Sequence, residues 1–133
     1  MTKTEYIAYW REAADDDWLP VQRMVAGGSY PQGLFFAWVM VEKLSKAHWV
    51  RHHADNARPP RNQPLPLLWQ QARLAPTAAQ LATLAQLNHH NPDSLYPTPG
   101  RRPAPVAAAA ATQLLADVAA LRTWLLNALP APH

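Results

Sequence analysis

Arginine and histidine side chains gather where one predicted helix ends and a loop begins. Arg51 is followed at once by His52 and His53, and Arg58 lies in the loop beyond them. Histidine is the side chain whose unperturbed pKa lies between about pH 5 and 8, so either imidazole could act as a general base. An arginine guanidinium presents a planar fork of N–H donors that matches a phosphate or a carboxylate. These residue types could therefore bind an anion and move a proton.

Two proline-rich loops carry further arginines. The loops span residues 53–66 and 91–105, and proline excludes regular structure from both. Arginines from loops that meet can hold a phosphate between them. In an up-and-down bundle, however, these two loops lie at opposite ends, so a shared site would need a second subunit or a loop that folds back. The ligand-binding residues predicted here are Arg58, Arg61, Arg101 and Arg102, and the alternative is that all four are solvated.

Histidines could also bind a metal, because His48 and His52 are four residues apart on one predicted helix and His89-His90 lie near the end of another. Two histidines with the first spacing share a helix face and can hold a metal if a third ligand converges. The neighbouring carboxylates, Asp55 and Asp93, complete no known ligand signature, and the chain has no cysteine. We therefore predict no metal and no cofactor, and interpret these histidines as polar residues at helix ends.

The elements that must position these residues are all predicted to be helices. Apolar residues recur at spacings of three and four, which is typical of amphipathic helices. Thr4 can cap a first helix, Gly27-Gly28 ends it, and Pro31 lies in the first turn of a second. The predicted helical segments are 4–26, 30–53, 67–87 with a break at Pro76-Thr77, and 106–129. We predict one all-α domain over residues 1–133, an up-and-down bundle of four to five helices.

The segment 34–41 is apolar without a break. A helix that is apolar on every side must be covered on every side. It is therefore the central helix of one bundle, or it lies between two bundles in a dimer. We predict a homodimer on this pattern, with the small side chains of 107–111 allowing close approach of a second helix. The predicted interface residues are Leu34, Phe35, Trp38 and Val41.

Charged residues around this apolar helix are predicted to be structural. Asp17 lies on the otherwise apolar stripe of the first helix, where an unpaired carboxylate would be costly. We expect it to pair with Lys43 or Lys46. Glu42 and Lys46 are four residues apart in the order that favours a pair on one helix.

Composition limits the class of protein. The chain has 133 residues, six tryptophans and a net charge of +3, which leans towards an anionic partner. It has no apolar run long enough to span a membrane, and its first residues lack the apolar stretch of a signal peptide. The absence of cysteine excludes disulfides. We expect a cytoplasmic protein that does not enter a membrane.

The order of several short motifs resembles that of the HEPN domains (higher eukaryote and prokaryote nucleotide-binding), which are small helical bundles. The resemblance covers nearly the whole chain, although no single motif is specific. The matching segments are Asp17-Trp18, Gly28-Ser29-Tyr30, 41–47 (VEKLSKA), Pro59-Pro60 with the leucines of 65–68, and Tyr96-Pro97.

Departures from that family concern its polar residues. Trp38 and Val39 stand where the family commonly has His-Gln, Gln63 replaces an expected histidine, and Leu95 and Thr98 replace a flanking Arg and Asp. Catalytic members are ribonucleases with a histidine four to six residues after an arginine, and no arginine here has that spacing.

The resemblance therefore implies a non-catalytic binding module for a nucleotide, RNA or a protein. The family's usual protein partner is a minimal nucleotidyltransferase, often in a toxin–antitoxin pair. The alternative is a metal-independent endoribonuclease with a site composed across a dimer from Arg51, His52, His53 and Arg58. A third possibility is a structural subunit without a ligand.

Overall fold

The fold is known from a computed structural model of the chain. It describes residues 1–54, 57–61, 63–96, 98–100, 102 and 105–129. The elements in those ranges are helices, which confirms the predicted all-α class. None of these helices is long and apolar enough to cross a membrane. The elements are α1 (Lys3–Ala26), α2 (Tyr30–Arg51), α3 (Leu65–Gln71), α4 (Ala78–Leu87), α5 (Ala108–Asn127), and the short 3₁₀ helices η1 (Asn88–His90) and η2 (Pro92–Leu95).

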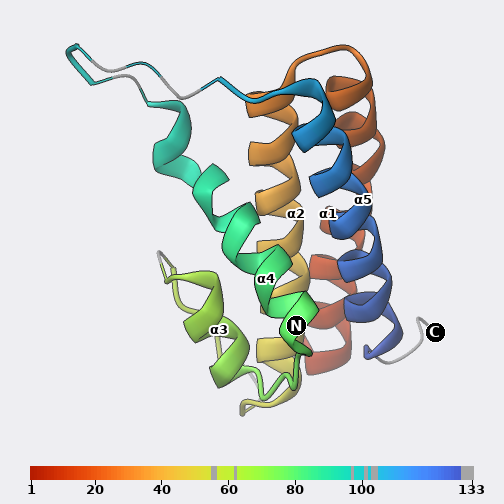
Figure 1. The fold of residues 1–133 in the computed structure, drawn as a ribbon. Helices are drawn as coiled ribbons and strands as arrows, with labels where there is room; N and C mark the ends of the chain where they lie inside the picture. The colour runs from red at the N-terminus through yellow and green to blue at the C-terminus, as the bar shows by residue number, and fades with distance from the viewer. Residues whose placement is uncertain (55–56, 62, 97, 101, 103–104, 130–133) are drawn as a thin grey trace.

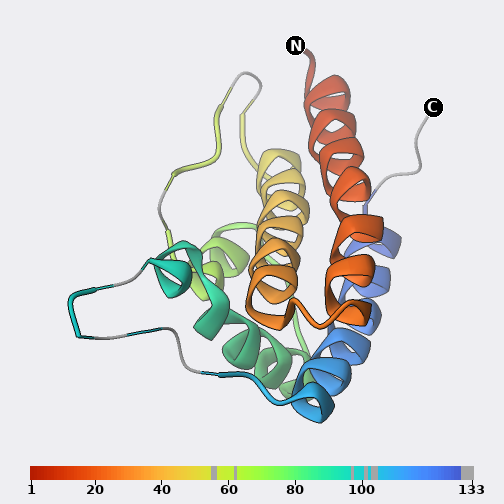
Figure 2. The same ribbon diagram turned by 90° about the horizontal axis from the view of Figure 1, so that it is seen from above.

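The long helices form an up-and-down bundle around α2. Helices α1 and α5 run beside α2 on one side, and α3 and α4 cover its other side (Figures 1 and 2). Because α1 and α2 run in opposite directions, the first residues of α1 lie beside the last residues of α2. The first turns of α2 and α5 lie together at the opposite end (Figure 1). The bundle therefore has two distinct ends, each built from several elements.

Local sequence explains how α1 begins and how it meets α2. Thr2, and not Thr4, caps α1: its hydroxyl accepts a hydrogen bond from the backbone N–H of Glu5, whose carboxylate in turn accepts one from the N–H of Thr2. After the turn at Gly28, α2 starts with proline in its first turn, as predicted. A Cβ atom on Gly33 would lie 2.8 Å from the side chain of Val25, so glycine there lets α1 and α2 approach closely.

Helix α2 is the central helix of this bundle. Leu34 and Val41 are fully buried and Trp38 is only 5% exposed, all within a single chain. This corrects the assignment of these three residues to a dimer interface, because a side chain enclosed by its own chain presents no surface to a partner. Phe35 is half-buried, and its neighbour Phe36 is exposed. The homodimer itself stays a prediction that would need another surface.

Polar contacts in the core fix the helices that surround α2. The Trp69 indole of α3 donates a 2.8 Å hydrogen bond to the Ser45 hydroxyl of α2, which itself donates to the Val41 carbonyl. On the opposite side, His48 is buried and its Nε2 donates to the carbonyl of Leu125 in α5 at 2.8 Å. Both bonds lie in the C-terminal half of α2. They hold α3 and α5 in place at the end of the bundle where Arg51 ends α2 and His52 and His53 follow it.

Candidate functional site

Five basic side chains from four parts of the chain surround the end of α2. We call this cluster the basic end. Lys3 is the first residue of α1, Arg51 and His52 end α2, Arg58 follows in the connection to α3, and Arg73 follows α3. The antiparallel packing of α1 on α2 and the Trp69–Ser45 bond explain why residues so distant in sequence meet here.

The electrostatics of His52 show how closely these charges lie. Loss of solvation lowers its pKa first, and the positive charges of Arg51, Arg73, His53 and Lys3 lower it further. A lowered pKa favours the neutral imidazole near pH 7, because protonation would add one more positive charge to the group. The basic end therefore brings several positive charges close together, and a bound anion would relieve their repulsion.

A pocket of about 240 Å³ opens at the basic end, between the first turn of α1 and the residues after α2. Lys3 and Arg58 supply its charged side chains, and Tyr6 and Val50 supply parts of its wall. Lys3 also places its Nζ 3.5 Å from the carbonyl oxygen of Arg51, which ties the start of α1 to the end of α2. Two cations beside an aromatic and an aliphatic wall suit an anionic group attached to a less polar body.

The backbone of Arg73 has an unusual conformation. Its φ of 57° makes it the only non-glycine residue with positive φ in the described part of the chain. The N–H of Leu74 donates to the carbonyl of Trp69 and that of Arg73 to Gln70, both at 3.1 Å, which is the Schellman ending of a helix. Glycine is the usual residue at this position because a Cβ is unfavourable there. The backbone of Arg73 is therefore strained in this conformation. Its side chain is exposed, and its charge lies at the basic end.

The sequence-predicted catalytic residues do not form one cleft. Arg51 donates from Nη1 to the carbonyl of Ala128, beyond the end of α5. His53 places Nδ1 2.6 Å from the Trp49 carbonyl and stacks on the Trp49 indole at 3.6 Å between ring centroids. Of the predicted set, Arg58 alone lines the pocket. Two of the four side chains are thus engaged in holding the helix ends, and among the described residues neither a histidine nor a carboxylate lines the pocket.

The structure also bears on the histidines that were considered as metal ligands. His48 is a core residue whose pKa is lowered by burial, and its Nε2 proton is committed to Leu125. In the described residues, no group of three or more histidine, aspartate or glutamate side chains is arranged to hold a metal ion.

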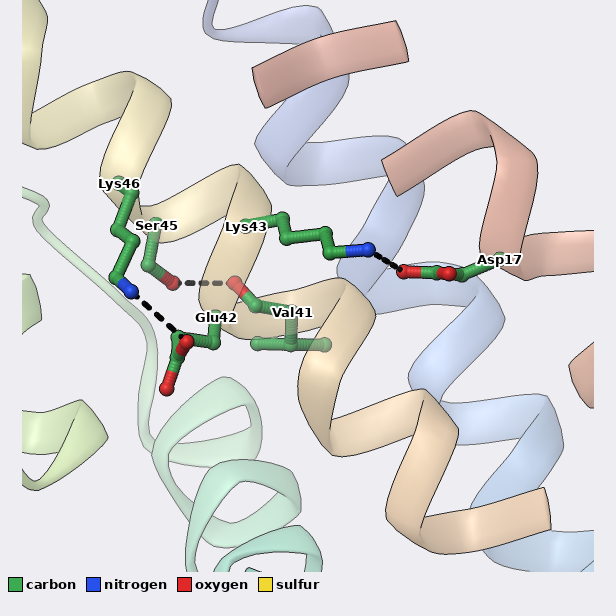
Figure 3. A network of polar contacts seen from close by, with 6 residues as sticks. All are labelled: Asp17, Val41, Glu42, Lys43, Ser45 and Lys46. Carbon is green, nitrogen blue, oxygen red and sulfur yellow. Dashed lines mark hydrogen bonds and ion pairs between the residues drawn. The ribbon is translucent and has the colours of Figure 1, made fainter. Parts of the chain in front are cut away.

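The predicted ion pairs lie in the middle of the bundle. Lys43 Nζ is 2.8 Å from Asp17 Oδ2, and Lys46 Nζ is 3.0 Å from Glu42 Oε1, which confirms both pairs (Figure 3). The first is a charge contact whose angle is outside the range of a hydrogen bond. A further pair, which the sequence did not predict, joins Arg122 to Asp15 at 3.0 Å. Each of these carboxylates is offset by a cation of its own and therefore does not neutralise the basic end.

Arg58 and Arg102, two of the four predicted ligand-binding arginines, do not share a site. Arg58 lies in the pocket beside Val50, near the end of α2, whereas Arg102 lines a different pocket beside Pro31, at its start. At 1.5 Å per residue, these two ends of α2 are roughly 30 Å apart. Arg61 is exposed in the connection from α2 to α3, and Arg101 lies outside the described residues. Of the predicted ligand-binding residues, Arg58 belongs to the basic end. Lys3 and Arg73 also belong to it, although the sequence did not indicate either residue.

Comparison with known proteins gives no relative from which to carry over a function. No protein-family model matches the chain, and no curated protein or solved structure matches it. The resemblance to HEPN domains therefore rests on the order of the sequence motifs alone.

Proposed function

We propose that this chain is a non-catalytic module that binds single-stranded RNA at the basic end. The observation that carries the proposal is the pocket in which Lys3 and Arg58 lie beside Tyr6, next to a second, exposed tyrosine. A positively charged groove combined with exposed aromatic rings is the arrangement that single-stranded nucleic acids require. The positive net charge supports the same partner.

The size of the pocket favours a strand over a free nucleotide. Pockets that enclose whole small molecules measure roughly 300–1,000 Å³. The pocket at the basic end measures about 240 Å³ and is open to solvent, so it suits one phosphate group of a longer chain. Arg73, exposed on the neighbouring connection, is placed for a second phosphate. The charges are thus spread over a surface, as a strand requires, and not concentrated around one small ligand.

The aromatic side chains of α1 supply a surface for bases. Tyr6 lines the pocket, and its ring lies 6.2 Å from that of Tyr9 at an angle of 18° between the ring planes. Tyr9 is 49% exposed and also contacts Trp10 edge-on at 5.2 Å, which limits its movement. A base stacked on such a ring contributes about 1–3 kcal/mol to binding. The strand would therefore run from the pocket along the first turns of α1.

The contacts of the histidines support a binding role over the ribonuclease alternative. Arg51 and His53 are held by backbone carbonyls, and His52 does not line the pocket. A nucleotidyltransferase partner and a toxin–antitoxin context stay expectations of the HEPN resemblance.

RNA titration tests the proposal directly. The anisotropy of a labelled single-stranded RNA is measured against wild type, Arg58→Ala, Tyr9→Ala and the control Arg23→Ala. Arg23 is an exposed residue near the other end of α1, so its replacement removes the same charge from outside the site. Tyr9→Ala should weaken binding by about 5- to 150-fold, which corresponds to one lost base stack. Equal affinity for all four proteins would refute the basic end as the RNA site.

A further inference from the structure

The pocket at the opposite end of α2 has a lining unlike that of the basic end. It measures about 570 Å³ and lies between η1, η2, the first turn of α2 and the residues before α5. This volume lies within the range of pockets that enclose a small molecule, roughly 300–1,000 Å³. We call it the second pocket. The lining residues that bear on its chemistry are Pro31, His90, Asp93, Ser94, Tyr96 and Arg102.

Part of the second pocket is held rigidly. The Trp38 indole of α2 donates a 3.2 Å hydrogen bond to the Asn88 side chain at the start of η1. The Asn91 side chain accepts a 3.0 Å hydrogen bond from the N–H of Asp93, which fixes the start of η2. The wall formed by η1 and η2 is therefore in place before any ligand arrives, and a preformed wall reduces the entropy lost on binding.

The field inside the second pocket favours an anion. Arg102 supplies a positive charge, and Pro31 and Val106 lie at the N-terminal ends of α2 and α5. Those ends carry partial positive charge from unpaired N–H groups. Neither helix has a side-chain cap or an acidic residue in its first turn, whereas α1 and α4 both begin with a capping box. Three sources of positive potential therefore face this one cavity.

Two further polar side chains line the second pocket. The hydroxyl oxygen of Ser94 is buried and has no hydrogen-bond partner among the described residues, which is costly unless a ligand or water supplies one after a small rotation of the side chain. Burial, followed by the charge of His89, lowers the pKa of His90, so its imidazole is neutral near pH 7 and can donate or accept.

The aromatic and acidic residues narrow the class of ligand. Tyr96 is 75% exposed at the rim, an unusual exposure for a large ring in a chain that buries most of its aromatic surface. A planar ligand would cover it. Asp93 also lines the pocket, and its carboxylate would repel a ligand that carries many negative charges. The ligand should therefore be flat and carry a single anionic group.

From this arrangement we infer that the second pocket binds a small aromatic anion, with its phosphate or carboxylate near Arg102 and Ser94 and its ring against Tyr96. The inference does not rest on RNA binding, because the two sites share no lining residue and lie at opposite ends of α2.

Titration with phenyl phosphate tests the inference, because this probe has one ring and one anionic group. Calorimetry and ¹H–¹⁵N NMR spectra are recorded on the full chain for wild type, Arg102→Ala, Tyr96→Ala and the control Arg23→Ala. Arg23 carries an exposed charge at the same end of the bundle but does not line the pocket. Thermal melts of each variant verify that folding is retained, which is expected because all three residues are exposed.

The expected result is saturable binding that shifts the amide signals of η1 and η2. Affinity should fall about five-fold or more in both Arg102→Ala and Tyr96→Ala, and remain unchanged in Arg23→Ala. Benzoate in place of phenyl phosphate distinguishes a carboxylate from a phosphate ligand, and inorganic phosphate reports the contribution of the ring. The inference is overturned if phenyl phosphate does not saturate, if either pocket variant binds as wild type does, or if inorganic phosphate binds equally well.

Discussion

Replacing Arg73 by glycine should stabilise the protein and weaken RNA binding at the same time. Most substitutions that remove a functional contact also lower the stability of the protein. A variant that becomes more stable while its RNA affinity falls would therefore show that the two effects have separate causes. The reason lies in the backbone: Arg73 has φ 57° at the Schellman ending of α3, where glycine fits without strain. Its charge contributes to the basic end, where it lowers the pKa of the neighbouring His52. The effect of the backbone strain on stability and the effect of the charge on RNA binding can be separated by comparing two variants.

Arg73→Ala and Arg73→Gly both remove the charge, but only glycine relieves the left-handed backbone. A non-glycine residue in that conformation costs roughly 1–2 kcal/mol, and glycine loses about 0.5–1 kcal/mol more conformational entropy on folding. The glycine variant should therefore be more stable than the alanine variant by about 0.5–1 kcal/mol, which is a difference of roughly 2–5 °C in melting temperature for a domain of this size. Arg73→Lys keeps the charge and serves as the positive control for binding.

Urea or thermal melts give the stability difference, and RNA anisotropy gives the affinities. Both charge-removing variants should bind RNA equally weakly, and Arg73→Lys should retain most of the affinity. If the alanine and glycine variants are equally stable, the backbone of Arg73 is not strained. If both bind RNA as wild type does, Arg73 makes no contact with the ligand.

Three other predictions follow from contacts described above. Burial lowers the pKa of His48, so the unfolded chain binds more protons than the folded one in acid. Stability should therefore be complete above the ordinary histidine pKa of about 6.5 and fall as the pH drops below it, and urea melts of His48→Gln should show a weaker dependence than wild type because an amide does not titrate. Asp17→Ala leaves the half-buried Lys43 without its partner and should lower the free energy of unfolding by about 1 kcal/mol, whereas the exposed Asp16→Ala should change it by less than about 0.5 kcal/mol; equal urea melts for the two variants would show that the pair is solvated. The purified protein should bind RNA without cutting it, since Arg51 and His53 are held by backbone carbonyls; cleavage that disappears in His52→Ala would restore the ribonuclease alternative.

Much of the fold could be predicted because local signals agree with it. Pro31 and the glycines at 27 and 28 placed the α1–α2 turn, and the spacing of apolar residues gave the helical class. The start of α1 was misplaced at Thr4, although Thr2 and Glu5 have the spacing of a capping box, which was the better signal. Helices α3 and α4 are separated near the predicted break.

The rest could not be predicted because sequence does not say which surface covers an apolar residue. The run from 34 to 41 fits a bundle core as well as a dimer interface, and only the packing of α1, α3 and α5 around α2 distinguishes them. The residues of the basic end could be predicted only in part for the same reason. Arg58 was identified because it lies in a proline-rich loop, whereas Lys3 and Arg73 join it only through the packing of α1 and α3 against α2. His48, a candidate metal ligand by spacing, is a core residue because α5 places a carbonyl beside it.

The salt dependence of RNA binding tests the central claim most directly. Each phosphate contact with single-stranded nucleic acid contributes about 0.7 to the slope of log K against log salt concentration. Replacing Arg58 by alanine and Arg73 by glycine in one protein should therefore make the slope shallower by about 1.4. Arg23→Ala, at the other end of α1, should leave it unchanged. An unaltered slope in the double variant would show that RNA does not bind at the basic end.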